Sequence, residues 1–135
     1  MIFYYTVEEI KLRDFPWDKV AWAVDENGSP YIPRHVTPEA SVLILWKDDK
    51  RVAYLVYDVS YKVGQVEIHY VHTPYQRKGY ATKLMNEISR RHNSQYEIHA
   101  YSTSDIAEHL LTKCGFERAD PGQTKWVRRP AREGV

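Results

Sequence analysis

The stretch Thr73-Pro-Tyr-Gln-Arg-Lys-Gly-Tyr-Ala-Thr82 decides the fold, because it joins a predicted strand directly to a predicted helix. Residues 65–73 before it are rich in β-branched and aromatic side chains, and residues 79–91 after it place apolar side chains at helical spacing. The first amides of a helix have no intrahelical partners, and the helix dipole is positive there. The junction therefore predicts an anion-binding site.

The residues of this loop suit a phosphate ligand. Gly79 lets backbone amides approach a ligand closely, and Ala81 is small enough not to block that approach. Arg77 and Lys78 add positive charge nearby. We therefore expect amides between Arg77 and Thr82 to donate hydrogen bonds to phosphate oxygens.

The strand that leads into the loop has two chemically different faces. Simple alternation predicts Val66, Ile68 and Tyr70 on one face and Glu67, His69 and Val71 on the other. One face thus carries a carboxylate and an imidazole. The same alternation predicts that His69 and His72 point to opposite faces, so we expect no shared metal site.

The rest of the chain predicts further strands and helices. Residues 41–46 and 51–59 are apolar runs joined by a turn at 47–50, which is typical of a hairpin. Later segments predict a strand at 96–101, a helix that ends at Gly115, and a final hairpin between 116 and 128. Cys114 continues the apolar stripe of that helix, which indicates a core position.

The first forty residues predict a short strand followed by one amphipathic helix. Apolar residues recur over positions 17–24 at i, i+3, i+4 and i+7, after Pro16 and before Asn27-Gly28. Three prolines between 29 and 38 predict an extended surface loop. Two interpretations of that loop stay open, a plain connector or one wall of a substrate groove.

Composition limits the function classes. The chain has 135 residues, the size of one domain spanning 1–135, and a net charge of +1, which argues against a dedicated nucleic-acid binder. Cys114 is the only cysteine, so an intramolecular disulfide and a thiolate metal cluster are both excluded. No run of 18 apolar residues occurs, so we expect a cytoplasmic protein without a membrane partner.

Three motifs together carry a family resemblance. Gln76-Arg-Lys-Gly79-Tyr-Ala81 resembles the Q/R-x-x-G-x-G/A pyrophosphate loop of the GNAT superfamily of acyl-CoA-dependent N-acyltransferases, and Val71-His-Thr-Pro74-Tyr resembles the strand exit before it. Residues 107–116 resemble the family's helix that ends in Gly-Phe, and the hairpin around 47–50 resembles its second and third strands. The matches come in the family's order and cover residues 41–128.

The resemblance implies an α/β (α+β) fold with a mixed, mainly antiparallel central sheet flanked by helices. The sheet would be splayed between the strands at 65–73 and 96–101, with acetyl-CoA as cosubstrate in the gap. A backbone amide near His69 would polarise the thioester carbonyl. The coenzyme-binding residues it implies are His69, Tyr70, Val71, Gln76, Arg77, Lys78, Gly79, Tyr80, Ala81, Thr82 and Ser104, the last standing where many members have asparagine.

The implied reaction is direct attack of a neutral amine on the thioester, which needs a general base. Glu67 is the first candidate, although an ordinary exposed strand glutamate stays an open alternative. His99 on the next strand is the second candidate. Many members use a tyrosine as proton donor to the leaving thiolate, but this chain has Leu111 at that position, which should slow turnover more readily than abolish it. Tyr101 and Ser102 are the candidate substitutes.

The predicted function is an N-acetyltransferase that acts on an amine of a small molecule, a protein or an aminoacyl-RNA. Acceptor contacts are expected from residues 16–38. Three alternatives stay open: transfer of a longer acyl group, a non-catalytic acyl-CoA-binding or regulatory module, and nucleic-acid binding through scattered basic residues. A homodimer is left open as well. His35, His92 and His109 are interpreted as surface histidines.

Overall fold

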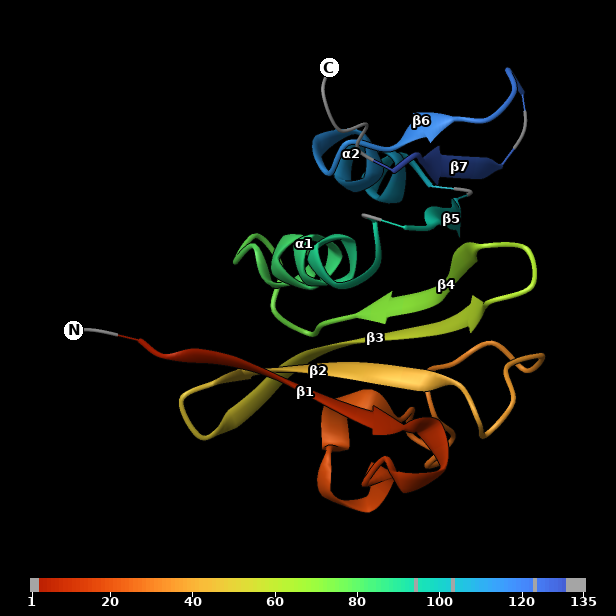
Figure 1. Ribbon diagram of the computed structural model, residues 1–135. Helices are drawn as coiled ribbons and strands as arrows, with labels where there is room; N and C mark the ends of the chain where they lie inside the picture. The colour runs from red at the N-terminus through yellow and green to blue at the C-terminus, as the bar shows by residue number, and fades with distance from the viewer. Residues whose placement is uncertain (1–2, 94, 103, 123, 131–135) are drawn as a thin grey trace.

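A seven-stranded sheet in the order β1-β2-β3-β4-β5-β7-β6 forms the centre of the computed structural model (Figure 1). The structure describes residues 3–93, 95–102, 104–122 and 124–130. The strands are β1 (Tyr5–Lys11), β2 (Ser41–Lys47), β3 (Lys50–Ser60), β4 (Gln65–His72), β5 (Glu97–Tyr101), β6 (Glu117–Arg118) and β7 (Lys125–Arg128). Strands β4 and β5 pair in parallel, and the other pairs are antiparallel. The predicted mixed, mainly antiparallel sheet is confirmed.

Helix α1 (Tyr80–His92) covers one face of the sheet, and α2 (Asp105–Lys113) lies on the same side (Figure 1). The apolar stripe of α1 packs on Leu43, Leu55 and Ile68 of the strands beneath. Leu111 and Cys114 are buried in this core as well, which confirms the predicted core position of Cys114. No helix among the described residues is long and apolar enough to cross a membrane.

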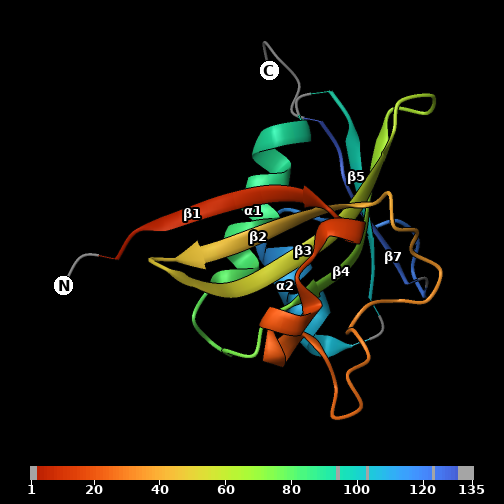
Figure 2. The ribbon, with the colours of Figure 1, turned by 90° about the horizontal axis from the view of Figure 1, so that it is seen from below.

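The opposite face is covered by the N-terminal segment (Figure 2), but the predicted amphipathic helix there is wrong. The segment forms three 3-10 turns, η1 (Leu12–Asp14), η2 (Trp17–Lys19) and η3 (Ala21–Ala23). Val20 breaks the helical path with φ −124° and ψ 82°. The kinked path lets Phe15, Val20 and Ala23 all reach the sheet, and this burial outweighs helix propensity.

Strand β4 contains a bulge that the predicted alternation missed. Val56 of β3 pairs with Tyr70 and Tyr57 pairs with Ile68, so His69 is an extra residue on β4. The bulge moves Tyr70 to the face opposite Ile68, into the core under the N-terminal segment. His69 and His72 now share that face, so the prediction that they point to opposite faces is wrong.

The predicted splay lies between β4 and β5. Their pairing covers only Gln65 to Glu67 on β4 and Glu97 to His99 on β5. Beyond Glu67, β4 pairs with no described strand on its β5 side, while β5 continues in contact with β7. The sheet therefore opens along the bulged half of β4, which leads directly to the loop before α1.

Candidate active site

The loop before α1 has the backbone of an anion site. Arg77 has φ 60° and Gly79 has φ 77°, so the chain turns sharply into the helix. Gly79 is the N-cap of α1, no side chain caps the helix, and no acidic residue lies in its first turn. The amide of Lys83 makes a helical bond to the Gly79 carbonyl at 3.0 Å, which leaves the amides before it for a ligand.

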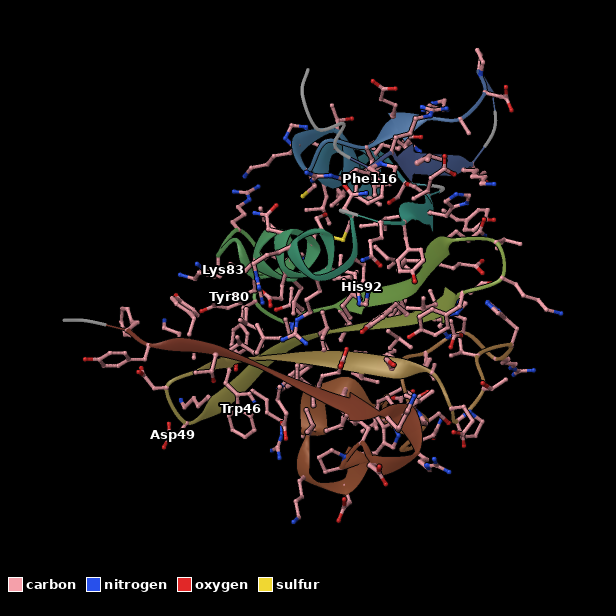
Figure 3. All side chains as sticks on the ribbon, in the orientation of Figure 1. Trp46, Asp49, Tyr80, Lys83, His92 and Phe116 are labelled. Atoms are coloured by element: carbon pink, nitrogen blue, oxygen red, sulfur yellow. The ribbon has the colours of Figure 1, made fainter. Side chains whose placement is uncertain are left out.

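Space in front of this loop is open. A Cβ placed on Gly79 would meet no atom within 4 Å. Gln76, Arg77 and Lys78 are exposed, and Ala81 and Thr82 are half-buried. Tyr80 is different because its side chain is buried in the core beside the start of α1 (Figure 3). Only the backbone amide of Tyr80 is therefore placed to meet a ligand.

The bulged half of β4 presents backbone groups where the sheet opens between β4 and β5. A bulge leaves its extra residue outside the regular ladder, so the backbone around His69 is only partly engaged by β3. Tyr70 and Val71 follow on the edge that β5 leaves uncovered. The three predicted backbone contacts thus lie on one strand edge, and the strand ends at the predicted phosphate loop.

A histidine of this strand is paired with a carboxylate of the neighbouring strand β3, and the sequence pattern did not predict this pair. Nε2 of His69 is 2.8 Å from Oδ2 of Asp58 on β3. The His69 side chain is only 8% exposed, whereas Asp58 is half exposed. The ring of His35, from the proline-containing loop, lies 5.3 Å from the His69 ring. His35 therefore lies at this site, which favours the groove-wall interpretation of its loop.

The two predicted catalytic side chains lie beside each other. Glu67 on β4 is in register with His99 on β5, at the last residue pair before the splay. No hydrogen bond or ion pair links the Glu67 carboxylate to another described residue. His99 is 5% exposed, its Nε2 lies 3.0 Å from Glu97 Oε1, and its Nδ1 is buried with no hydrogen-bond partner among the described residues.

Aromatic rings continue the same face toward the end of β4. His72 lies in a ring cluster with Tyr70, Tyr31 and Trp22, and all are grouped around buried Tyr54. The Tyr54 hydroxyl donates a hydrogen bond to the Tyr31 carbonyl, and His72 Nε2 lies 3.2 Å from the Trp22 carbonyl. Residues from the predicted acceptor region, 16–38, therefore pack along one face of the bulged strand.

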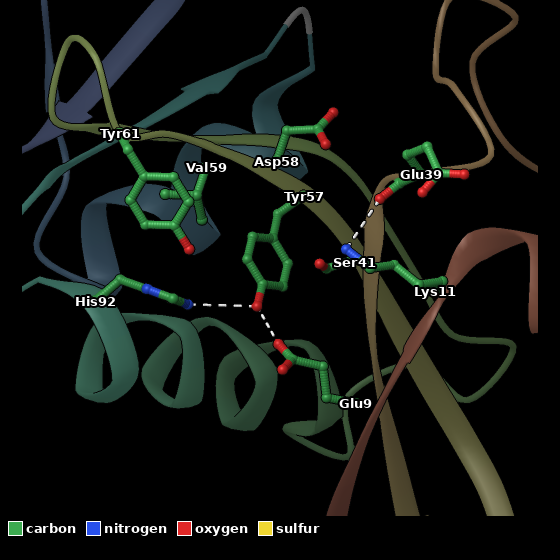
Figure 4. A pocket seen from close by; sticks show the side chains of 9 residues that line it. All are labelled: Glu9, Lys11, Glu39, Ser41, Tyr57, Asp58, Val59, Tyr61 and His92. Atoms are coloured by element: carbon green, nitrogen blue, oxygen red, sulfur yellow. Dashed lines mark hydrogen bonds between the residues drawn. The ribbon is translucent and has the colours of Figure 1, made fainter.

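A polar cleft of about 410 Å³ lies near the other end of α1 (Figure 4). It is lined by Glu9, Lys11, Glu39, Ser41, Tyr57, Asp58, Val59, Tyr61 and His92. Tyr57 donates a hydrogen bond to Glu9, and its hydroxyl lies 3.3 Å from His92 Nε2. His92 is thus half-buried in a cleft rather than on the open surface, about 18 Å along α1 from Tyr80.

Acid should destabilise the fold from about neutral pH downward. Burial lowers the pKa of His72 and His92 below the usual 6.5, although Trp22 and Glu9, respectively, oppose this and Arg91 adds to it at His92. The unfolded chain then takes up protons below pH 6.5 that the folded chain does not, so stability falls as pH falls. Urea midpoints between pH 8 and 5.5 should decline, and less steeply in His72→Gln. The exposed-site variant His109→Gln should match the wild type.

The structure also places four other residues that the sequence analysis singled out. The Ser104 hydroxyl caps α2 by accepting a hydrogen bond from the Ala107 amide at 3.2 Å. Leu111 is buried in the core, so no proton donor stands there. Tyr101 is exposed, whereas Ser102 is buried and donates to the Ser104 carbonyl.

The basic residues do not form one free patch in the part of the chain that is described. Arg91 Nε lies 2.8 Å from Glu87, which Arg90 also contacts. Arg128 donates to the Cys114 carbonyl at 2.6 Å, and Lys83 lies over the ring of Tyr5 (Figure 3). Arg132 lies outside the described residues. Among the described side chains, no group of three or more His, Cys, Asp or Glu is arranged to hold a metal ion.

The sequence matches the acetyltransferase (GNAT) family over residues 4–116, which is most of the chain. The chain belongs to the GNAT acetyltransferase family. A search among curated proteins found no match to it. Within this GNAT chain, the matched region includes the loop before α1, the bulged strand β4 and the end of α2.

Solved structures share the GNAT fold at low sequence identity. The catalytic domain of Tetrahymena GCN5 histone acetyltransferase, in complex with coenzyme A, has a TM-score of 0.64 at 13% identity, covering 97% of this chain and 95% of that one. The ribosomal-protein-S18-alanine N-acetyltransferase from Escherichia coli has a TM-score of 0.64 at 15% identity, covering 98% and 99%. IAA acetyltransferase from Bacillus cereus has a TM-score of 0.67 at 13% identity, covering 93% and 99%.

Proposed function

We propose that this chain is a single-domain cytoplasmic N-acetyltransferase that moves the acetyl group of acetyl-CoA to an amine by direct attack. The observation that carries the proposal is the uncapped start of α1 at the end of a strand edge that β5 leaves open. That arrangement offers phosphate-binding amides at the end of a strand edge whose backbone groups can bind pantetheine. Family membership supports the same activity.

In this proposal the coenzyme lies along β4. The amides near Arg77, Gly79 and Thr82 bind the pyrophosphate, with charge added by Arg77 and Lys78. Gln76, Tyr80 and Ala81 complete the loop, Tyr80 through its amide alone. Backbone groups of the bulged strand, from His69 to Val71, meet the pantetheine and the thioester carbonyl. Ser104 is the N-cap of α2, and the turn that it caps forms part of the proposed coenzyme site.

The chemistry needs a neutral amine and an acceptor for its proton. The amine nitrogen attacks the carbonyl carbon, the carbon–sulfur bond breaks, and the coenzyme leaves as a thiolate. Glu67 and His99 are the sequence candidates for the base, and they lie in register at the splay. Position 111 holds a leucine in place of the tyrosine that many members have, so protonation of the thiolate is slower. Transfer still occurs, because the thiolate is a tolerable leaving group.

The solved neighbours are consistent with this function at the level of their names. The Tetrahymena GCN5 structure contains coenzyme A. The Escherichia coli neighbour is named as an N-acetyltransferase of ribosomal-protein-S18 alanine. We propose an amine acceptor here too, and residues of the N-terminal segment beside β4 are the surface that selects it.

Release of free coenzyme A thiol tests the proposal. We expect acetyl-CoA-dependent thiol release with at least one member of a panel of small amines, peptides with free N-termini and lysine peptides. Butyryl-CoA and longer acyl-CoAs run in parallel test the longer-acyl alternative. Coenzyme binding without turnover on any acceptor would instead support the non-catalytic acyl-CoA-binding module, for which buried Leu111 is the supporting observation.

A further inference from the structure

We propose that His69, oriented by Asp58, is the general base that takes the proton from the acceptor amine. The proposal rests on the acetyltransferase function above and assigns a catalytic side chain within it. Asp58 acts as a positioning residue because it reaches the reaction only through His69. Sequence analysis assigned His69 a backbone role alone and assigned no role to Asp58.

The geometry of the pair favours one tautomer of the neutral imidazole. Nε2 of His69 lies 2.8 Å from Oδ2 of Asp58, so a proton on Nε2 is donated to the carboxylate. The lone pair of the neutral ring is then on Nδ1. No described residue hydrogen-bonds to Nδ1 of His69, and this atom is not among the buried atoms that lack a partner. Nδ1 is therefore open to water or a ligand and free to accept a proton.

The position of His69 places this base beside the reacting carbonyl. His69 is the extra residue of the β4 bulge, and the backbone at the bulge is the proposed thioester contact. A base attached to the same residue lies within a few ångströms of an amine that attacks there, which is the reach a general base needs. The ring is 8% exposed and is flanked by His35, so its orientation is fixed by packing.

Neither sequence candidate has the same set of features. His99 is 5% exposed, its Nε2 is engaged by Glu97, and its Nδ1 is buried. Glu67 lies two residues before the bulge, and no hydrogen bond or ion pair to another described residue fixes its orientation. Asp58 of β3 and His35 of the loop contact His69, and Glu67 pairs with Asp58 in the β3–β4 ladder. The Asp58 carboxylate stabilises the imidazolium that forms on proton transfer.

The proton and electron pairs balance without any further reactant. The amine nitrogen forms a bond to the carbonyl carbon as its proton moves to Nδ1 of His69. The carbon–sulfur bond breaks and its electron pair stays on sulfur. The imidazolium then returns its proton to the thiolate or to water, which restores the neutral ring. Asp58 keeps its negative charge throughout.

Steady-state kinetics of His69→Gln tests the assignment. Loss of a general base costs about 100- to 10,000-fold, so we expect kcat to fall by that factor while the Kd for acetyl-CoA stays within about three-fold. Asp58→Asn should lower kcat at least about ten-fold, and Asp58→Glu should restore part of it. The matched control His109→Gln replaces an exposed histidine on α2 and should behave as the wild type.

One readout separates a base from a merely structural histidine. Activity of the wild type should rise with pH along a limb that His69→Gln lacks. Nitrogen-15 NMR of the wild-type histidines should show the proton of neutral His69 on Nε2, and Asp58→Asn should weaken that preference.

The outcomes distinguish this proposal from the proposed function. If the wild type acetylates no amine, the proposed function fails, and the base assignment fails with it. If the wild type is active and His69→Gln retains turnover within about three-fold, only the base assignment is overturned. Loss of turnover in Glu67→Gln or His99→Gln, with His69→Gln still active, would identify that residue as the base.

Discussion

The substitution Gly79→Glu should reduce the affinity for coenzyme A by at least about a hundred-fold while the chain stays folded. Like charges held close together in a binding site cost several kcal/mol, which corresponds to at least that factor. The Gly79→Glu side chain would project into open space in front of the α1 amides, where the account places the pyrophosphate. Isothermal titration with coenzyme A measures the loss, and circular dichroism checks the fold.

A matched control separates the ligand effect from backbone strain. Gly28 has φ 80°, close to the 77° of Gly79, and its Cβ would also meet nothing within 4 Å. Both substitutions therefore carry the same penalty for a left-handed residue, about 1–2 kcal/mol. Gly28→Glu should lose that stability and keep its affinity for coenzyme A. If the two variants bound coenzyme A with equal affinity, the loop before α1 would not be part of the coenzyme site.

Truncation of Tyr54 to alanine should lower the free energy of unfolding by about 3–5 kcal/mol. Tyr54 is completely buried, and the rings of Phe15, Trp17 and Trp22 pack around it. Its hydroxyl also holds the Tyr31 carbonyl. The variant therefore loses the anchor that holds the N-terminal segment on the sheet, and urea unfolding measures the cost.

The control for this prediction is Tyr4→Ala. Tyr4 is 69% exposed, so its truncation should change stability by no more than about 0.5 kcal/mol. If Tyr54→Ala were as stable as Tyr4→Ala, the aromatic cluster would not be what holds the N-terminal segment. If instead Tyr54→Ala is destabilised but keeps its coenzyme affinity, the two faces of the sheet are independent in function.

The parts of the fold set by local pattern could be predicted from the sequence. The apolar stripe of α1 and the runs of β2 and β3 identify their elements because period and composition are local properties. The loop before α1 was predicted for the same reason, since a strand, a glycine and a helix start occur in one short stretch. Leu111 and Cys114 followed from the stripe of α2.

The missed features depend on contacts between distant segments. The bulge at His69 depends on how β4 registers with β3, and alternation along β4 alone carries no sign of it. The 3-10 turns around Val20 form because the segment must fit Tyr54 and its neighbours across the sheet. The pairing of Asp58 with His69 follows from that register and bulge. In the sequence, the pair is indicated only by an acidic residue near the end of a predicted strand.

Amide chemical shifts measured during a coenzyme A titration locate the bound coenzyme on the protein. We expect the largest shifts at Arg77, Gly79, Tyr80 and Thr82 at the start of α1 and at His69 to Val71 along the bulged strand. Amides around the cleft at Glu9 and His92, near the far end of α1, should shift little. Shifts confined to that cleft, or no shifts at millimolar coenzyme A, would show that the coenzyme does not bind along β4 and the loop before α1.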